Sequence, residues 1–281
     1  MTSPELDGAR ETLLVQLREH ALVIGDVTLS SGQQASYYVD ARRALLRPEG
    51  FLAAGRLIAA AARDAGADAV VATAPFYAIT HTPQIKRHFE ILGEQAQIPV
   101  YAYDIPVCVH TKLDPDMLVD LGLSGAIAGV KDSSGDDISF RRLSLKNRAA
   151  GSPLTLFTGH EFVVDGAYLS GAHGSVPGLA NVDPAGYVRL HQAYLAGDWT
   201  AVRTEQDRLA SLMEICLAAK GITGWGAGVG AFKTALMLQG VITTNQVPEP
   251  FDALTGADVE AIRGILGAVG PATRDTVTAG R

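Results

Sequence analysis

Residues 98–136, IPVYAYDIPVCVHTKLDPDMLVDLGLSGAIAGVKDSSGD, contain the pattern that decides the fold. A short apolar run, IPVYAYDIP, precedes a helical stretch from about Pro115 to Leu121, and a second apolar run, GAIAGV, follows that stretch. Continuous apolar strands that alternate with helices are typical of parallel strands covered on both faces. This stretch therefore predicts one strand–helix–strand unit of a parallel sheet.

The same alternation continues along the chain on both sides of that unit. The other apolar runs are ADAVVATAP (67–75), LTLFTG (154–159) and GAHGSVPG (171–178), and helical stretches are expected near 81–96, from Asp137, at 161–170, up to residue 240 and at 257–268. About five βα units are visible, which is the pattern of a (β/α) TIM-type barrel or a doubly wound sheet. In both architectures the active site lies at the C-terminal ends of the strands.

The first 66 residues follow a different pattern. Residues 5–21 predict an amphipathic helix with Leu13, Leu14, Leu17 and Ala21 on one face. Residues 23–42 alternate, turn at SG (31–32) and alternate again, which predicts a hairpin, and a helix is expected from Pro48 to about Gly66. The prediction is an α/β protein with a non-barrel helix–hairpin–helix segment at 1–66 and a barrel portion at 67–281.

Composition excludes several classes of function. A formal charge of −7 without clusters of Lys or Arg argues against nucleic-acid binding, although a local pocket can still hold a small anion. The two cysteines, Cys108 and Cys216, form no C-x-x-C motif, which argues against a disulfide framework or a cysteine zinc site. Acids near the first residues and charges within the longest apolar run predict no signal peptide and no membrane span. We expect a cytoplasmic protein.

Lys131 stands where an apolar run ends, at the C-terminal end of an expected strand. A lysine amine among apolar side chains loses part of its preference for the charged form, and the neutral amine can form a Schiff base with a ketone. Such chemistry needs a proton shuttle, and Tyr103 occupies the matching position on the preceding expected strand. The alternative interpretation is a lysine that extends from the strand end into solvent.

Several motifs, in order, resemble those of one enzyme family between about Ala67 and Gly270. The motifs are TAPFY (73–77), YDIP (103–106), GVKDSSGD (129–136), LFTGHE (156–161), GAHGSVPGLANVDP (171–184) and GVGAFKTALMLQG (228–240). They resemble the pyruvate-dependent class I aldolases, the group of dihydrodipicolinate synthase, N-acetylneuraminate lyase and the 2-keto-3-deoxy sugar acid aldolases. A match of this length and order is more specific than any single motif.

This resemblance implies a role for each candidate residue. Lys131 would form an imine with pyruvate or another 2-keto acid, Tyr103 would move protons, and Tyr77 would reach the site of a neighbouring subunit. The backbone of Val176 would help to hold the pyruvyl carboxylate, and Gly159 and His160 would contact the substrate. The resemblance further implies a lyase without a metal or organic cofactor, in a homo-oligomer that is a dimer or a tetramer.

The chain departs from the family pattern in two places. Cys108 stands where dihydrodipicolinate synthases carry an arginine for their second substrate, which favours a lyase acting on a sugar-derived keto acid. Residues 1–66 contain no G-[ST]-T-G-E loop, the loop that holds the pyruvate carboxylate in family members, and about three βα units are missing with it. The expected barrel is therefore incomplete, and a catalytically inactive scaffold is the main alternative.

Residues 11–66 instead resemble the start of the orotate phosphoribosyltransferases, through VTLSSGQQASYYVDARRALLRPEGF (27–51). That resemblance implies a fusion of two families. A phosphoribosyl pyrophosphate site needs an acidic pair followed by a glycine–threonine loop, whereas GDDISFRR (135–142) has only the acids. Phosphoribosyl transfer is thus the weakest of the three interpretations.

Two other motifs suggest sites that we set aside. GWGAGVGAF (224–232) lacks the preceding strand and the following acid of a dinucleotide-binding loop, so a glycine-rich helix start is expected. The histidines form no H-E-x-x-H pattern, and Glu161 beside His160 suits a substrate hydroxyl better than a metal. Lys233 lies in an expected helix and is a poorer imine candidate than Lys131.

Overall fold

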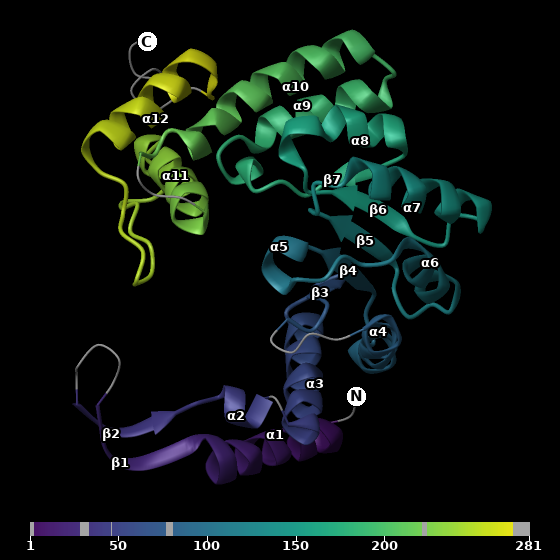
Figure 1. Cartoon of the computed structure of the whole chain (residues 1–281), viewed down its shortest axis with the longest axis vertical. Helices are drawn as coiled ribbons and strands as arrows, with labels where there is room; N and C mark the ends of the chain where they lie inside the picture. Colours follow the sequence, from purple (N-terminus) through teal and green to yellow (C-terminus); the bar gives the residue numbers. More distant parts are fainter. Residues whose placement is uncertain (1–2, 29–33, 46, 77–80, 221–223, 272–281) are drawn as a thin grey trace. The chain divides into compact units, whose positions relative to one another are not determined.

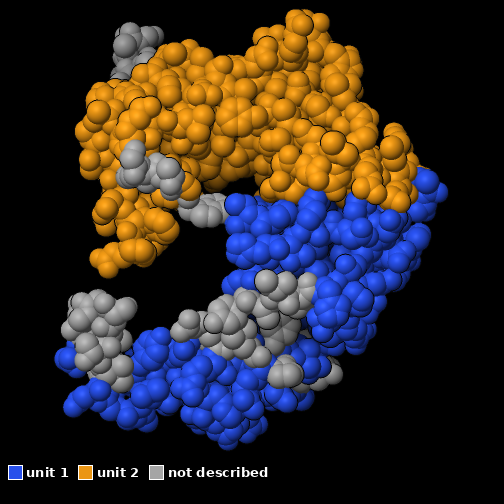
Figure 2. Space-filling model, in the orientation of Figure 1, with its two compact units in different colours: residues 1–130, 149–154 blue, residues 131–148, 155–281 orange. Residues whose placement is uncertain are grey.

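The structure is a computed structural model of the 281-residue chain (Figure 1), and it describes residues 3–28, 34–45, 47–76, 81–220 and 224–271. Contacts group the chain into two compact units, coloured separately in Figure 2. Unit 1 consists of residues 1–130 and 149–154, and unit 2 of residues 131–148 and 155–281. The division predicted from the sequence, between residues 66 and 67, concerns a different boundary and stays a prediction.

A five-stranded sheet contains all of the strands that the alternating pattern predicted. Its order is β3-β4-β5-β6-β7, and the pairs β3–β4 and β6–β7 are parallel. The strands are β3 (Val70–Thr73), β4 (Val100–Asp104), β5 (Gly129–Asp132), β6 (Thr155–Thr158) and β7 (Gly174–Ser175). Sequential order with a helix after each strand is the arrangement of a (β/α) barrel wall, which confirms the predicted α/β class with parallel strands.

Unit 1 begins with helices and a separate two-stranded sheet. Its elements before β3 are α1 (Ser3–Gln16), the π-helical turn η1 (Leu17–Ala21), β1 (Leu22–Thr28), β2 (Gln34–Val39), α2 (Arg42–Leu45) and α3 (Pro48–Asp64). β1 and β2 pair antiparallel, with an irregularity between Ile24 and Val27. The predicted turn at residues 31–32 lies outside the described residues.

The prediction of one amphipathic helix over residues 5–21 is wrong in part. The α-helix ends at Gln16, and the next turn is π-helical. Ala21 is fully buried but Leu14 is 44% exposed, so the predicted apolar face is not uniformly covered. By contrast α3 starts with Pro48 in its first turn, where the missing N–H of proline costs no hydrogen bond, as predicted.

The remaining helices of unit 1 lie beside β3 and β4. They are α4 (Thr82–Ala96), α5 (Pro106–Val109) and α6 (Pro115–Leu123). α3 and α4 pack against each other, and Arg56 Nε donates to Gln95 Oε1 over 2.7 Å between them. The side chain of Asp114 accepts from Met117 N and caps α6. The short helix α5 was not predicted, because its four residues are too few for a periodic pattern.

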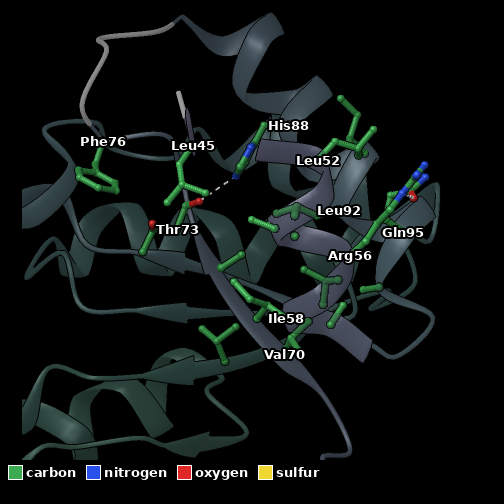
Figure 3. A pocket seen from close by; sticks show the side chains of 18 residues that line it. Leu45, Leu52, Arg56, Ile58, Val70, Thr73, Phe76, His88, Leu92 and Gln95 are labelled. Atoms are coloured by element: carbon green, nitrogen blue, oxygen red, sulfur yellow. Dashed lines mark hydrogen bonds between the residues drawn. The ribbon is translucent and has the colours of Figure 1, made fainter. Parts of the chain in front are cut away.

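A cavity of about 610 Å³ lies between α3, β3 and α4 in unit 1 (Figure 3). Apolar side chains line it, among them Ile58 of α3, Val71 of β3, Leu92 of α4 and Phe76, which follows β3. In the described part of the chain, β4 is the only strand that pairs with β3. The described part of unit 1 therefore carries a sheet edge and an apolar surface next to each other. The predicted incompleteness of the barrel stays a prediction.

Unit 2 carries the other helices. They are α7 (Asp137–Ala149), the 3₁₀ turn η2 (Glu161–Val163), α8 (Val164–Ser170), η3 (Leu179–Asn181), α9 (Pro184–Leu195), α10 (Trp199–Met213), η4 (Glu214–Leu217), α11 (Gly224–Leu238) and α12 (Gly256–Val269). The glycine-rich stretch at 224–232 begins α11, as predicted. In the described residues no helix is long and apolar enough to cross a membrane.

Ion pairs and backbone contacts of Arg208 join three helices of unit 2. Its Nη2 atom donates to Asp183 Oδ2 over 2.5 Å and to Glu205 Oε1 over 2.6 Å, and its Nη1 donates to the carbonyl of Val269 over 2.6 Å. Asp183 is buried and also caps α9 through Gly186 N. These contacts hold α9 and the end of α12 against α10.

Candidate active site

Three of the predicted site residues of unit 2 stand at consecutive strand ends. Lys131 is the third residue of β5, Gly159 directly follows β6, and Val176 directly follows β7. The ladder continues through them, since Gly159 N donates to Asp132 O over 2.7 Å and Val176 N donates to Thr158 O over 2.8 Å. All three therefore lie at the C-terminal edge of the sheet, as predicted.

The side chain of Lys131 runs close to Gly159. A Cβ atom at position 159 would lie 3.2 Å from Lys131 Cε and 2.0 Å from Ser133 Oγ. Glycine is thus the residue that lets the lysine stem and the serine hydroxyl approach the backbone here. The structure brings together Lys131 and Gly159, which the sequence placed only on separate expected strands.

The polar turn after Lys131 has a structural role of its own. Asp132 is buried, and its Oδ1 atom accepts from Ser134 N over 2.8 Å and from Ser134 Oγ over 2.7 Å. Asp136 Oδ1 accepts from Ser139 N over 2.8 Å and caps α7. The DSSGD segment thereby fixes the chain that leaves β5 and holds Lys131 at the end of its strand.

His160 lies between the end of β6 and the 3₁₀ turn η2, directly after Gly159. Its Nδ1 atom is 3.2 Å from Asp137 Oδ1, and its backbone N donates to Thr158 Oγ1 over 3.0 Å. An acceptor at Nδ1 favours the tautomer that carries its proton there, which leaves Nε2 as the atom available to a ligand. His160 is only partly buried, which suits contact with a substrate.

Glu161 follows His160 and turns inward. Its Oε1 atom accepts from Leu179 N over 2.5 Å, and the backbone of Gly178 donates to the same carboxylate. Burial raises the pKa of Glu161, while these two backbone bonds and the charge of Lys131 act in the opposite direction. The sequence suggested a substrate contact for Glu161, whereas the structure commits its carboxylate to the chain after β7.

Sequence reasoning missed several polar groups that are buried wholly or in part in unit 2. Gln206 Nε2 donates to Glu161 O over 3.0 Å, and its Oε1 accepts from Val164 N over 3.1 Å. Among the described residues the buried hydroxyl of Tyr187 has no hydrogen-bond partner, and burial raises the pKa of Tyr187. Burial also raises the pKa of the Cys216 thiol to about 12. A glutamine within the apolar stripe of α10 was the available signal for Gln206.

The backbone of Val176 was expected to help hold the pyruvyl carboxylate, but its N–H group is already bonded within the sheet. Its N–H is used by Thr158 O, and its side chain is 45% exposed. A contact between Val176 and a substrate therefore has to come from the carbonyl or the side chain.

The other candidates belong to unit 1. Tyr103 is partly buried on β4, directly before the fully buried Asp104. Asp104 pairs with Lys112 and accepts from Leu113 N over 3.2 Å. Tyr77 lies outside the described residues. In the parts of the chain that are described, no three His, Cys, Asp or Glu side chains gather as metal ligands would.

A family model matches most of the chain. The Dihydrodipicolinate synthetase family model covers residues 54–268. The chain belongs to the dihydrodipicolinate synthetase family. This assignment confirms the aldolase-family resemblance predicted from about Ala67, and the matched region begins earlier, at residue 54, within the segment predicted to resemble another family.

Curated family members are moderately similar in sequence. The 4-hydroxy-tetrahydrodipicolinate synthase 1 of Streptomyces coelicolor is 29% identical over 78% of this chain and 67% of its own length. The corresponding enzyme of Rhizobium meliloti is 33% identical over 54% of this chain and 51% of its own. The chain thus spans about half to two thirds of the curated family members it matches.

Solved structures of the family share the fold. Dihydrodipicolinate synthase of Bacteroides thetaiotaomicron superposes with a TM-score of 0.69 at 27% identity, covering 76% of this chain and 70% of that chain. Ruminococcus gnavus sialic acid aldolase gives a TM-score of 0.67 at 22% identity, covering 80% and 71%. These matches show that the chain shares the fold of these proteins. They do not support the predicted resemblance of residues 11–66 to orotate phosphoribosyltransferases.

Proposed function

We propose that the protein is a class I carbon–carbon lyase in which Lys131 forms a Schiff base with pyruvate or a related 2-keto acid. The observation that carries the proposal is the position of Lys131 at the end of β5, with its stem against Gly159, in a chain of the dihydrodipicolinate synthetase family. The family includes lyases and aldolases, and YagE of E. coli K12, a fold neighbour with a TM-score of 0.70, was solved in complex with pyruvate.

The proposed reaction follows from the amine. The lysine nitrogen bonds to the keto carbon, the ketone oxygen leaves as water, and the resulting iminium withdraws electrons from the neighbouring carbon. Loss of a proton from that carbon gives an enamine, which can attack an aldehyde, and the reverse sequence breaks the same carbon–carbon bond. Tyr103 is the proposed proton shuttle, Gly159, His160 and Val176 the proposed substrate contacts, and Tyr77 a contribution to a neighbouring subunit in a dimer or tetramer.

The proposed substrate is a keto acid derived from a sugar. Cys108, in α5, occupies the place that holds an arginine in dihydrodipicolinate synthases according to the motif resemblance. A thiol cannot form the paired hydrogen bonds that a guanidinium forms with a carboxylate. A hydroxylated aldehyde partner therefore fits better than one with a second carboxylate, and His160 Nε2 is a group that can contact such hydroxyls.

The test is trapping of the imine. Intact-mass spectrometry after incubation with pyruvate and borohydride is expected to show one reduced pyruvyl group on the parent and none on Lys131→Ala. Lys233→Ala is the matched control, because Lys233 lies on α11 and donates to Gln246 O. A folded parent without an adduct would overturn the proposal and favour the catalytically inactive scaffold, whose carboxylate loop is missing.

Tyr103→Phe separates the proton shuttle from imine formation. The variant is expected to bind pyruvate but to lose about 10²-fold or more in aldol cleavage, the usual range for a general acid–base group. Cleavage at the parental rate would exclude Tyr103 from proton transfer.

A further inference from the structure

We propose that Glu161 is a positioning residue, whose carboxylate holds the segment after β7 in the place where that segment can contact a keto acid bound to Lys131. The inference rests on the proposed function for its link to substrate. Its structural part, that the carboxylate of Glu161 tethers Gly178 and Leu179, stands on unit 2 alone.

The contacts of Glu161 define a clamp between two strand ends. The residue follows β6, and its carboxylate accepts from the backbone of Gly178 and Leu179, which follow β7. Leu179 is fully buried and Gly178 is partly buried, so water is poorly placed to replace these bonds. A carboxylate that accepts backbone N–H groups in such a setting is a strong and directional tether.

The backbone of Glu161 is itself held by a side chain of α10. Gln206 is almost fully buried on α10, donates to the carbonyl of Glu161 over 3.0 Å and accepts from Val164 N over 3.1 Å. These bonds fix the 3₁₀ turn η2, so the carboxylate of Glu161 starts from a rigid backbone. The segment it holds is also crowded, since a Cβ at Gly178 would lie 2.9 Å from Phe232 Cε2 and 3.5 Å from Glu161 Oε1.

The clamp is directed toward the candidate imine site. Glu161 lies two residues after Gly159, whose Cβ position would lie 3.2 Å from Lys131 Cε, and the charge of Lys131 favours the ionised form of the Glu161 carboxylate. Val176 lies two residues before Gly178 and follows β7 directly. The N–H of Val176 is held by Thr158 O, so movement of Gly178 and Leu179 would act on the carbonyl side of Val176, the side that remains available to a substrate.

Hydrogen exchange tests the clamp without any substrate. The amides of Gly178 and Leu179 are expected to exchange about tenfold faster or more in Glu161→Ala, the change expected when a bond to a charged acceptor is lost. Glu161→Gln keeps an acceptor oxygen and is expected to restore most of the protection. Glu260→Ala, which removes an exposed carboxylate on α12, is the matched control and should leave these amides unchanged.

The clamp would be overturned by parental protection of Gly178 and Leu179 in Glu161→Ala. Where that variant does not fold, Glu161→Asp provides the same test, because the shorter side chain withdraws the carboxylate without leaving a large cavity. Parental protection in Glu161→Asp would overturn the proposal equally.

Trapping kinetics test the link to substrate. In Glu161→Ala the pyruvate concentration for half-maximal adduct formation is expected to rise about tenfold, with the limiting rate largely retained. The reason is that a positioning residue affects the binding of pyruvate more than it affects the reactivity of the Lys131 amine. A lower limiting rate with unchanged half-saturation would overturn the positioning role. A parent that forms no adduct would instead overturn the proposed function, and the exchange result would then decide the clamp alone.

Discussion

A Cβ atom at Gly159 would lie 3.2 Å from the Cε atom of Lys131. The same atom would lie 2.0 Å from Ser133 Oγ, so two side chains from the end of β5 use the space that a glycine leaves open after β6. The missing side chain of Gly159 therefore leaves room for the residue proposed to form the imine.

We predict that Gly159→Ala slows imine formation although the variant still folds. Overpacking of this kind costs about 1–3 kcal/mol of stability, and displacement of the lysine stem should reduce borohydride trapping by about tenfold or more. Ser133→Ala removes the closer of the two contacts, so the double variant Gly159→Ala/Ser133→Ala is expected to regain stability but only part of the trapping rate. Full recovery of trapping would mean that Ser133, and not Lys131, carries the effect. Chemical denaturation and trapping rates of all three variants provide the measurements.

We predict that Lys112→Ala destabilises unit 1 by about 3 kcal/mol, because it removes the ammonium group that pairs with the fully buried carboxylate of Asp104. Asp104→Asn/Lys112→Ala is expected to recover most of that loss, since an uncharged amide can still accept from Leu113 N. Denaturant unfolding of the parent, both single variants and the double variant completes the cycle. Equal and additive losses from the two single variants would show that the pair does not couple.

We predict that the stability of unit 1 decreases in mild acid through His88. Burial lowers the pKa of His88 from its ordinary value of 6.5, and its Nε2 atom lies 3.1 Å from the carbonyl oxygen of Thr73. A histidine with a depressed pKa contributes stability that is complete above its unfolded pKa and is lost as the pH falls through the folded pKa.

The measurement compares urea midpoints at about pH 7.5 and about pH 5.5, on the two sides of the ordinary histidine pKa. His88→Gln should reduce the difference between the two midpoints. His81→Gln, at an exposed position just before α4, is the control and should keep the parental difference. If His88→Gln kept the parental difference between the two urea midpoints, His88 would be excluded as the source of that difference.

We predict that the apolar surface beside β3 binds a hydrophobic dye in the folded protein. Ile58, Val71 and Phe76 are 67%, 59% and 66% exposed, and all three line the cavity of Figure 3. Contiguous exposed apolar surface of this kind is uncommon in soluble proteins. Ile58→Lys/Val71→Lys should reduce dye fluorescence severalfold, whereas Leu195→Lys, on α9 of unit 2, should not, although Leu195 is 70% exposed. Equal fluorescence in all variants would exclude this surface.

Much of the fold was predictable because strand and helix periods are local properties. The apolar runs that contain β3 to β6 and the helix starts at Pro48, Pro115 and Asp137 are visible in the sequence, since proline and capping residues act within a few positions. α5 and the π-helical turn η1 were not predictable. Both are one turn or little more in length, and tertiary contacts outweigh local preference in segments that short.

The candidate site was predictable only in part. The sequence by itself determined that Lys131 ends an apolar strand, that a DSSGD turn follows it, and that Gly159 and Val176 end the next two strands, because these are matters of local pattern and motif order. The tertiary structure decided that Gly159 accommodates the lysine stem, that Glu161 binds Gly178 and Leu179, and that Gln206 fixes η2. Those contacts join residues from different strands and helices, and their hydrogen-bond partners and burial exist only once the elements pack.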